Sequence, residues 1–131
     1  MKKLVPVVFA AALLLSACSG TAEPVDTSSG TTAPVATVVD RTADVSAALS
    51  PELAAFVTQA EEPETGRINV STTIVDPRGS NGSADAVTAL AICTAVSQLD
   101  GIENVSIYEA DGTSLVLFGH PSVPAGKCGE V

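Results

Sequence analysis

The sequence has few of the residues that recognise nucleic acids, sugars or anionic lipids. It contains no Trp and only four aromatic residues, one Tyr and three Phe, which argues against an aromatic platform for stacking bases or sugars. Only six Lys and Arg stand against 15 Asp and Glu. Because proteins bind nucleic acid largely by neutralising phosphates with basic side chains, nucleic acid and a bare anionic lipid surface are excluded as expected partners. The acidity favours solubility and self-repulsion.

A long apolar run is missing as well. The apolar segment near the start, Leu4–Leu14, has eleven residues, whereas a transmembrane helix needs roughly 20. Lys2 and Lys3 precede it. A short positive region followed by a short apolar one is typical of a secretory signal peptide.

The next four residues are Leu15-Ser16-Ala17-Cys18. They resemble the lipobox of bacterial lipoproteins, with Leu at −3, small residues at −2 and −1, and Cys at +1. The resemblance implies that Cys18 receives a diacylglyceryl group, that cleavage before it removes residues 1–17, and that further acylation with palmitate anchors the chain at the extracytoplasmic face of the cell membrane. The alternative is an ordinary signal peptide with a chance Cys; residues 1–17 leave the mature fold either way.

Removing the signal peptide takes away two of the six basic residues and no acid, so the mature chain has a net charge near −11. Residues 18–44 are rich in Ser, Thr, Ala and Pro, a composition that predicts a disordered tether. Residues 45–131 are enough for one small domain.

Cysteine usage points to the same compartment. With Cys18 assigned to lipid, Cys93 and Cys128 remain as an even pair, which predicts a disulfide in an oxidising environment. The alternative is a pair of redox or metal thiols, but the spacing is not Cys-x-x-Cys.

Five segments show a regular pattern. Ser50-Pro51-Glu52 predicts a helix start, and an apolar stripe through Leu53, Phe56, Val57 and Ala60 continues it to about Glu61. Alternation over 66–76 predicts a strand. Ser83 is expected to cap a helix over 84–99. Asp111-Gly112 predicts a hairpin between 104–109 and 113–118.

The hairpin register can be predicted from its turn. A two-residue loop places Ile107 opposite Val116 and Val105 opposite Phe118, all on one face. The other face then carries Ser106, Tyr108, Leu115 and Leu117.

The order strand, helix, strand, strand predicts a small α+β domain. We expect a β-α-β-β mixed sheet with one long helix packed on it and a shorter N-terminal helix. The helix followed by Gly101-Ile102-Glu103-Asn104-Val105-Ser106-Ile107 is similar to the BON and GerMN envelope domains. The run from Glu109 to Pro121 resembles small uncharacterised actinobacterial exported proteins, which implies an envelope-associated, non-catalytic module.

Two places carry candidate chemistry. His120, the single histidine, would be a general base if Asp76 or Asp111 oriented it and Ser122 were the nucleophile; a surface histidine is the favoured alternative. Asp76 and Arg78 lie in a loop before a helix start, where an anion or calcium is conceivable, although a capped turn is favoured.

The sequence therefore favours a non-catalytic lipoprotein that binds an envelope protein, a cell-wall polymer or a small ligand. Its expected contact surface is the exposed side of the hairpin, with Tyr108, Leu115 and Leu117. The alternatives are a small hydrolase or metal-binding protein centred on His120, and a thiol redox protein using Cys93 and Cys128. No metal or cofactor is expected.

Overall fold

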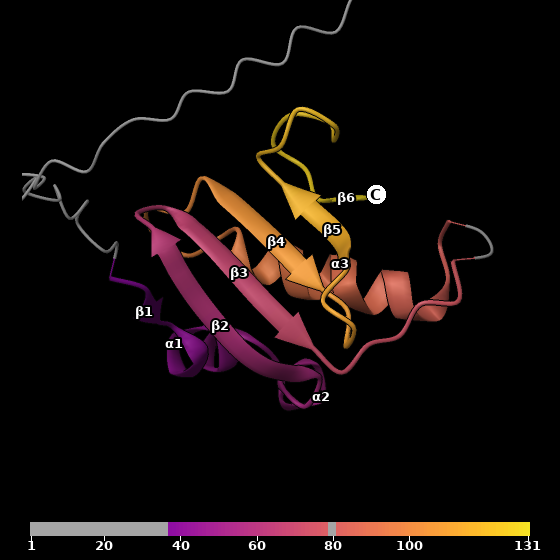
Figure 1. Cartoon of the computed structure of the whole chain (residues 1–131), viewed down its shortest axis with the longest axis horizontal. Coiled ribbons are helices and arrows are strands. Elements are labelled where there is room, and N and C mark those ends of the chain that lie inside the picture. Colours follow the sequence, from indigo (N-terminus) through magenta and orange to yellow (C-terminus); the bar gives the residue numbers. More distant parts are fainter. Residues whose placement is uncertain (1–36, 79–80) are drawn as a thin grey trace, which may run out of the picture. The chain divides into compact units, whose positions relative to one another are not determined.

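The computed structural model describes residues 37–78 and 81–131. The predicted signal peptide, Cys18 and most of the predicted tether lie outside the described residues. The described part is an α+β fold with a six-stranded mixed sheet (Figure 1). Its elements in chain order are β1 (Val39–Asp40), α1 (Thr42–Ala48), α2 (Pro51–Ala54), β2 (Val57–Glu64), β3 (Arg67–Thr72), α3 (Ala84–Val96), β4 (Asn104–Tyr108), β5 (Ser114–Phe118) and β6 (Gly129–Glu130).

The strands lie in the sheet in the order of the chain, from β1 to β6. Every neighbouring pair is antiparallel except β3 and β4, which are parallel. Parallel neighbours need a long crossover connection, usually a helix, and α3 supplies it. The predicted α+β class with a mixed sheet is thereby confirmed, and β3, α3, β4 and β5 form the central part of a larger sheet.

The predicted helix over residues 50–61 is wrong beyond its first turn. Ser50 does cap a helix, since its hydroxyl accepts the N–H of Leu53 (3.4 Å), but that helix ends at Ala54. The chain then enters β2, and the N–H of Thr73 bonds the carbonyl of Phe56 (2.9 Å). A short apolar run fits either period, and the open backbone edge of β3 decides in favour of a strand.

The secondary structure begins before residue 45, which is the predicted start of the folded domain. Val39 and Asp40 form β1, and α1 starts at Thr42. Helix α1 contributes Val45, which is fully buried. The sequence shows no hydrophobic periodicity that would predict these elements, because a seven-residue helix needs only one or two core residues.

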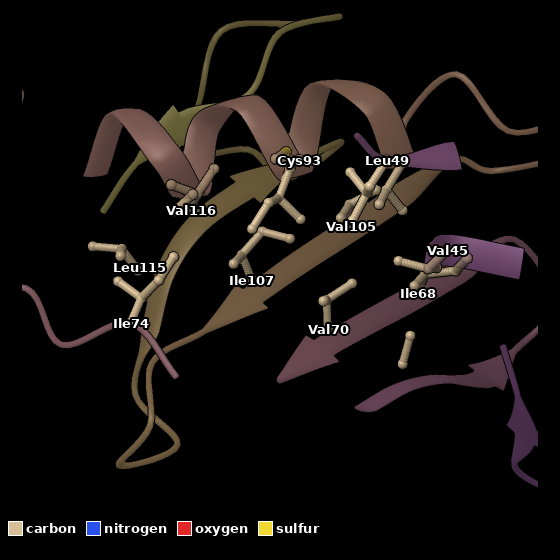
Figure 2. Close-up of a cluster of buried hydrophobic side chains, with 14 residues drawn as sticks. Val45, Leu49, Ile68, Val70, Ile74, Cys93, Val105, Ile107, Leu115 and Val116 are labelled. Carbon is tan, nitrogen blue, oxygen red and sulfur yellow. The ribbon is translucent and has the colours of Figure 1, made fainter. Parts of the chain in front are cut away.

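Three helices pack on one face of the sheet, and one core unites them with the strands (Figure 2). Val45 of α1 and Ile92 and Cys93 of α3 join Ile68 and Ile107 in this core. The opposite face, here called the open face, carries alternate strand residues and no described helix. Its cross-strand rows are Glu61, Asn69, Ser106 and Leu117, and beside them Gln59, Ser71, Tyr108 and Ser114.

The central pairs of the hairpin have the predicted register, but its turn is longer than predicted and one strand contains a bulge. Val105 pairs with Phe118 and Ile107 with Val116, as predicted, whereas Tyr108 pairs with Ser114 after a register shift. The turn is one residue longer than expected, because Glu109 bonds Thr113 (2.9 Å) and Gly112 takes a φ of +83°. A bulge at Leu115 compensates for the longer loop.

The bulge changes the environment of Leu115. Leu115 and Val116 are both buried, at 2% and 0% exposure, and Leu115 lies beside Ile74 in Figure 2. The prediction that Leu115 belongs to the exposed face is therefore wrong. Tyr108 and Leu117 remain half-buried on the open face.

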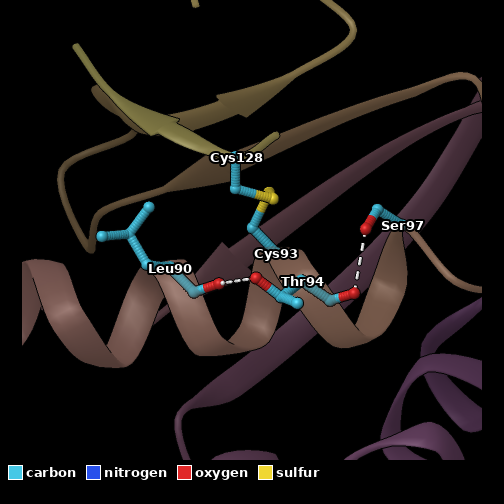
Figure 3. Close-up of a disulfide and its surroundings, with 5 residues drawn as sticks. All are labelled: Leu90, Cys93, Thr94, Ser97 and Cys128. Atoms are coloured by element: carbon cyan, nitrogen blue, oxygen red, sulfur yellow. Dashed lines mark hydrogen bonds between the residues drawn. A yellow bond between two sulfur atoms is a disulfide. The ribbon is translucent and has the colours of Figure 1, made fainter. Parts of the chain in front are cut away.

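Cys93 and Cys128 form the predicted disulfide, with their Cα atoms 6.2 Å apart (Figure 3). Cys93 is fully buried on α3, and Cys128 is half-buried directly before β6. The bridge joins residues 35 positions apart, which in the chain-entropy account stabilises the fold by about 3–4 kcal/mol.

Candidate functional site

The predicted site residues Asp76 and Arg78 lie together where the chain leaves β3. They meet Glu109, which stands at the start of the turn between β4 and β5. The two segments are joined by the N–H of Ala110, which bonds the carbonyl of Ile74 (2.9 Å). Asp76 and Glu109 are buried, at 7% and 5% exposure. The polar cluster of Asp76, Arg78, Ser83 and Glu109 is the candidate site.

Glu109 is the acceptor at the centre of this polar cluster. Its Oε1 accepts the backbone N–H of Asp76 (2.6 Å). Its Oε2 accepts Nε of Arg78 (3.0 Å) and also Nη2. The guanidinium continues to the carbonyl of Ser114 (3.1 Å). Arg78 thus neutralises a buried carboxylate and ties the loop to β5.

Asp76 organises the start of α3. Its Oδ1 accepts the N–H of Arg78 (2.6 Å), and its Oδ2 accepts the hydroxyl of Ser83. That hydroxyl in turn accepts the N–H of Ala86 (2.9 Å), so Ser83 caps α3 as predicted. The helix N-terminus and the guanidinium are both engaged by this chain's own carboxylates. The arrangement therefore stabilises a capped turn.

The hydrogen bonds lower the pKa of Asp76. The largest cause is the bond from Ser83, followed by the bond from the Arg78 N–H, and the Arg78 charge acts in the same direction. Burial opposes these effects. A depressed pKa means that the folded state favours the ionised carboxylate.

This pKa shift predicts a contribution to acid unfolding. Stability from ionised Asp76 is fully present above the pKa of the unfolded chain, about 3.9. It is lost as pH falls through the lower pKa of the folded state. We expect Asp76→Asn to make urea stability less dependent on pH below 4 than in the parent. Asp100→Asn, at an exposed turn position, is the control, and equal pH slopes for parent and Asp76→Asn would contradict the prediction.

Tyr108 lies close to the polar cluster but on the open face. It pairs with Ser71 of β3 and with Ser114 of β5, and Arg78 bonds the carbonyl of Ser114. The hydroxyl of Thr72 bonds the Tyr108 carbonyl (2.8 Å). Tyr108 thus forms the aromatic part of a surface whose other members are amides, hydroxyls, Leu117 and the carboxylate of Glu61.

His120 is not brought together with the acids that the hydrolase hypothesis requires. It is exposed just after β5, and its Nδ1 lies 2.7 Å from the hydroxyl of Ser122. Asp111 lies in the turn before β5, and Asp76 lies near that same turn. Five strand residues span about 13 Å or more, so His120 is at the other end of the sheet. Among residues 37–78 and 81–131, no three His, Cys, Asp or Glu are placed to hold a metal ion.

Glu109 is the member of the polar cluster that sequence reasoning missed. A usable signal was present, because Val105, Ile107 and Glu109 alternate onto the same buried face. A carboxylate at a core position requires a partner. Arg78 lies in a loop that passes the end of the hairpin, and it is the cation that could pair with Glu109.

Comparison with known proteins yields no relative. The chain matches no protein-family model, no curated protein and no solved structure. In the part of the chain that the structure describes, no helix combines the length and apolar character needed to cross a membrane.

Proposed function

We propose that this protein is a membrane-anchored extracytoplasmic lipoprotein whose folded part is a non-catalytic binding module of the cell envelope. The observation that carries the proposal is Leu15-Ser16-Ala17-Cys18 directly after a positively charged start and an eleven-residue apolar run. Two or more acyl chains on Cys18 would give a stable anchor. The segment between Cys18 and β1 would be the tether.

The disulfide supports the proposed location. Disulfides form and persist in oxidising compartments outside the cytoplasm, and Cys93 and Cys128 are bridged. The mature chain is also strongly acidic, which argues against direct adhesion to anionic lipid and leaves the acyl group as the means of attachment.

The open face supports the binding role. It combines half-buried Tyr108 and Leu117 with the uncharged Asn69, Ser71 and Ser106. Such a surface offers hydrogen-bond donors and acceptors around a small apolar centre. We propose a single small domain that presents this face to an envelope protein or a cell-wall polymer.

The test is a capture experiment from intact envelopes, preceded by mass analysis of the mature protein. We expect a chain beginning at Cys18 with a diacylglyceryl group, and Cys18→Ala is expected to lose both the diacylglyceryl group and cleavage at this position. The neighbouring Ser19→Ala is the control, because it keeps the thiol. An unmodified mature N-terminus would refute the anchor.

Capture itself is compared between the acylated protein and a Tyr108→Ser, Leu117→Ser double variant. We expect the double variant to remain anchored but to lose the captured component. Val87→Ser, which changes an exposed residue of α3 on the other face, is expected to keep it. Capture that survives the double variant and fails with Val87→Ser would place the contact elsewhere and refute the role of the open face.

A further inference from the structure

The most apolar strand of the sheet lies next to its edge. Strand β5 reads Ser114-Leu115-Val116-Leu117-Phe118, with four apolar residues in a row and no charge. Among the described strands only β6 lies outside it, and β6 has two residues. Its pairing consists of Val116 with Glu130 and Leu117 with Gly129, extended by the Val131 N–H on the Leu115 carbonyl (3.0 Å). A bare apolar edge of this kind would be a template for another strand.

The segment that carries β6 has few other contacts. Of residues 119–127, which join β5 to Cys128, only Val123 is buried. The side chain of Glu130 accepts one exposed N–H, that of Gly82 (3.0 Å). Cys128, directly before β6, is bonded to the buried Cys93. Apart from the short pairing with β5, the disulfide is therefore the main attachment of β6 to the folded part. Segments with so few buried contacts open locally at low cost.

The opposite edge of the sheet is protected differently. The outward N–H and C=O of Ala60 are taken by Thr42 Oγ1 (2.9 Å) and by the Arg41 N–H (2.8 Å). Pro63 has no N–H to offer, and β1 brings Asp40 opposite Glu61. Prolines and charges at an edge discourage pairing with another chain. Edge pairing between two copies is thus favoured at β5.

We infer that the Cys93–Cys128 disulfide locks the edge of the sheet, and that opening it lets β5 pair with β5 of a second copy of this chain. A dithiol opens the bond: one thiolate attacks the half-buried Cys128 sulfur, and Cys93 leaves as a thiolate that takes up a proton. The second thiolate of the dithiol then displaces Cys128 and closes a cyclic disulfide. Two electrons and two protons pass to the protein, and the dithiol is oxidised.

A second copy of this chain is the occupant that the β5 edge favours, because a strand can pair antiparallel with its own sequence. The chain carries nine more acidic than basic residues, so two copies repel each other over most of their surface. Strand β5 carries no charge, so this repulsion is weak along it. Antiparallel pairing of one β5 with another is self-complementary, and it closes a two-fold dimer with no further edge at that side.

The test uses the full chain carrying Cys18→Ala, so that Cys93 and Cys128 are its only cysteines, in one detergent throughout. Mass is measured by light scattering before and after dithiothreitol. We expect the protein mass to double on reduction with retention of the far-ultraviolet spectrum. A reduced protein that stays folded at its original mass overturns the inference.

Two variants and one control variant separate edge pairing from general unfolding. Deleting residues 129–131 removes β6 and leaves the disulfide in place; this variant is expected to dimerise while oxidised, and an oxidised monomer refutes the lock. Leu117→Glu places a charge on the edge and is expected to keep the reduced protein at its single-chain mass. Ser106→Glu puts the same charge on the same face one strand inward and is expected to leave dimerisation unchanged. If Leu117→Glu does not fold, the deletion variant alone decides.

Discussion

Replacing Gly119 by alanine is expected to lower the free energy of unfolding by about 2–4 kcal/mol. Gly119 directly follows β5 and has a φ of +73°, a region that costs a residue with a Cβ about 1 kcal/mol or more. A Cβ at this position would also overlap the carbonyl oxygen of Glu103 and lie 2.9 Å from Oδ1 of Asn104. The chain must shift to relieve that overlap, and overpacking typically costs a further 1–3 kcal/mol. Urea unfolding measures the difference.

Gly126 provides a matched control for Gly119. Its φ is +70°, and a Cβ there would meet nothing within 4 Å. Gly126→Ala is therefore expected to cost only the backbone term, about 1 kcal/mol. Equal losses at the two positions would show that the close approach to Glu103 contributes nothing, contrary to the prediction.

The contact at Gly119 also fixes where the C-terminal segment begins. Strand β5 ends beside the start of β4, because Phe118 pairs with Val105. The tight passage over Glu103 and Asn104 turns the chain away from the sheet there. Residues 120–128 then return to Cys93 and place β6 on the edge of β5. The same close approach that makes Gly119 hard to replace therefore directs the chain toward Cys93, where the disulfide holds β6 on the edge of β5.

The central unit could be predicted from sequence because local signals and burial agree there. Alternation over residues 68–74 places Ile68, Val70 and Ile74 in the core, although β3 itself ends at Thr72, and Ser83 caps α3 where expected. The paired cysteines predicted the disulfide. In each case a short-range pattern is sufficient, since the tertiary environment asks for the same residue types as the local structure.

Strand β2 was not predicted, because its sequence is compatible with both a helix and a strand. Phe56 and Val57 lie at helical spacing from Leu53, and nothing local shows that the edge of β3 needs a partner. That need is a property of the assembled sheet, which overrides weak local propensity. The bulge at Leu115 was not predicted for a similar reason. The turn has one residue more than expected and the bulge takes up one extra residue of β5, so the pairing of Ile107 with Val116 is unchanged.

Part of the candidate site could be predicted from the sequence and part could not. Asp76 and Arg78 stand two residues apart in a turn-forming loop, so their proximity is local. Their link to Glu109 spans more than 30 positions and depends on β3 and β4 being parallel neighbours. The exposed position of His120 agrees with the surface histidine favoured from sequence, whereas its distance from Asp76 depends on how the strands are arranged in the sheet.

Glu109→Ala is expected to lower the free energy of unfolding by about 2–3 kcal/mol. The substitution leaves the buried N–H of Asp76 without its acceptor, and an unsatisfied buried group costs about 1–3 kcal/mol. It also frees Arg78, whose side chain is 43% exposed. Because water can then solvate the guanidinium, the lost ion pair adds no more than about 1 kcal/mol.

A second substitution at the same position separates the two effects. Glu109→Gln keeps a side-chain oxygen for the Asp76 N–H but removes the charge facing Arg78, so we expect a smaller loss, about 1 kcal/mol. Glu103→Ala, at an exposed position before β4, is expected to change stability by less than about 0.5 kcal/mol. If Glu109→Gln destabilises as much as Glu109→Ala, the charge rather than the acceptor joins the loop to the hairpin, and the assignment of the backbone bond as the main contribution is wrong.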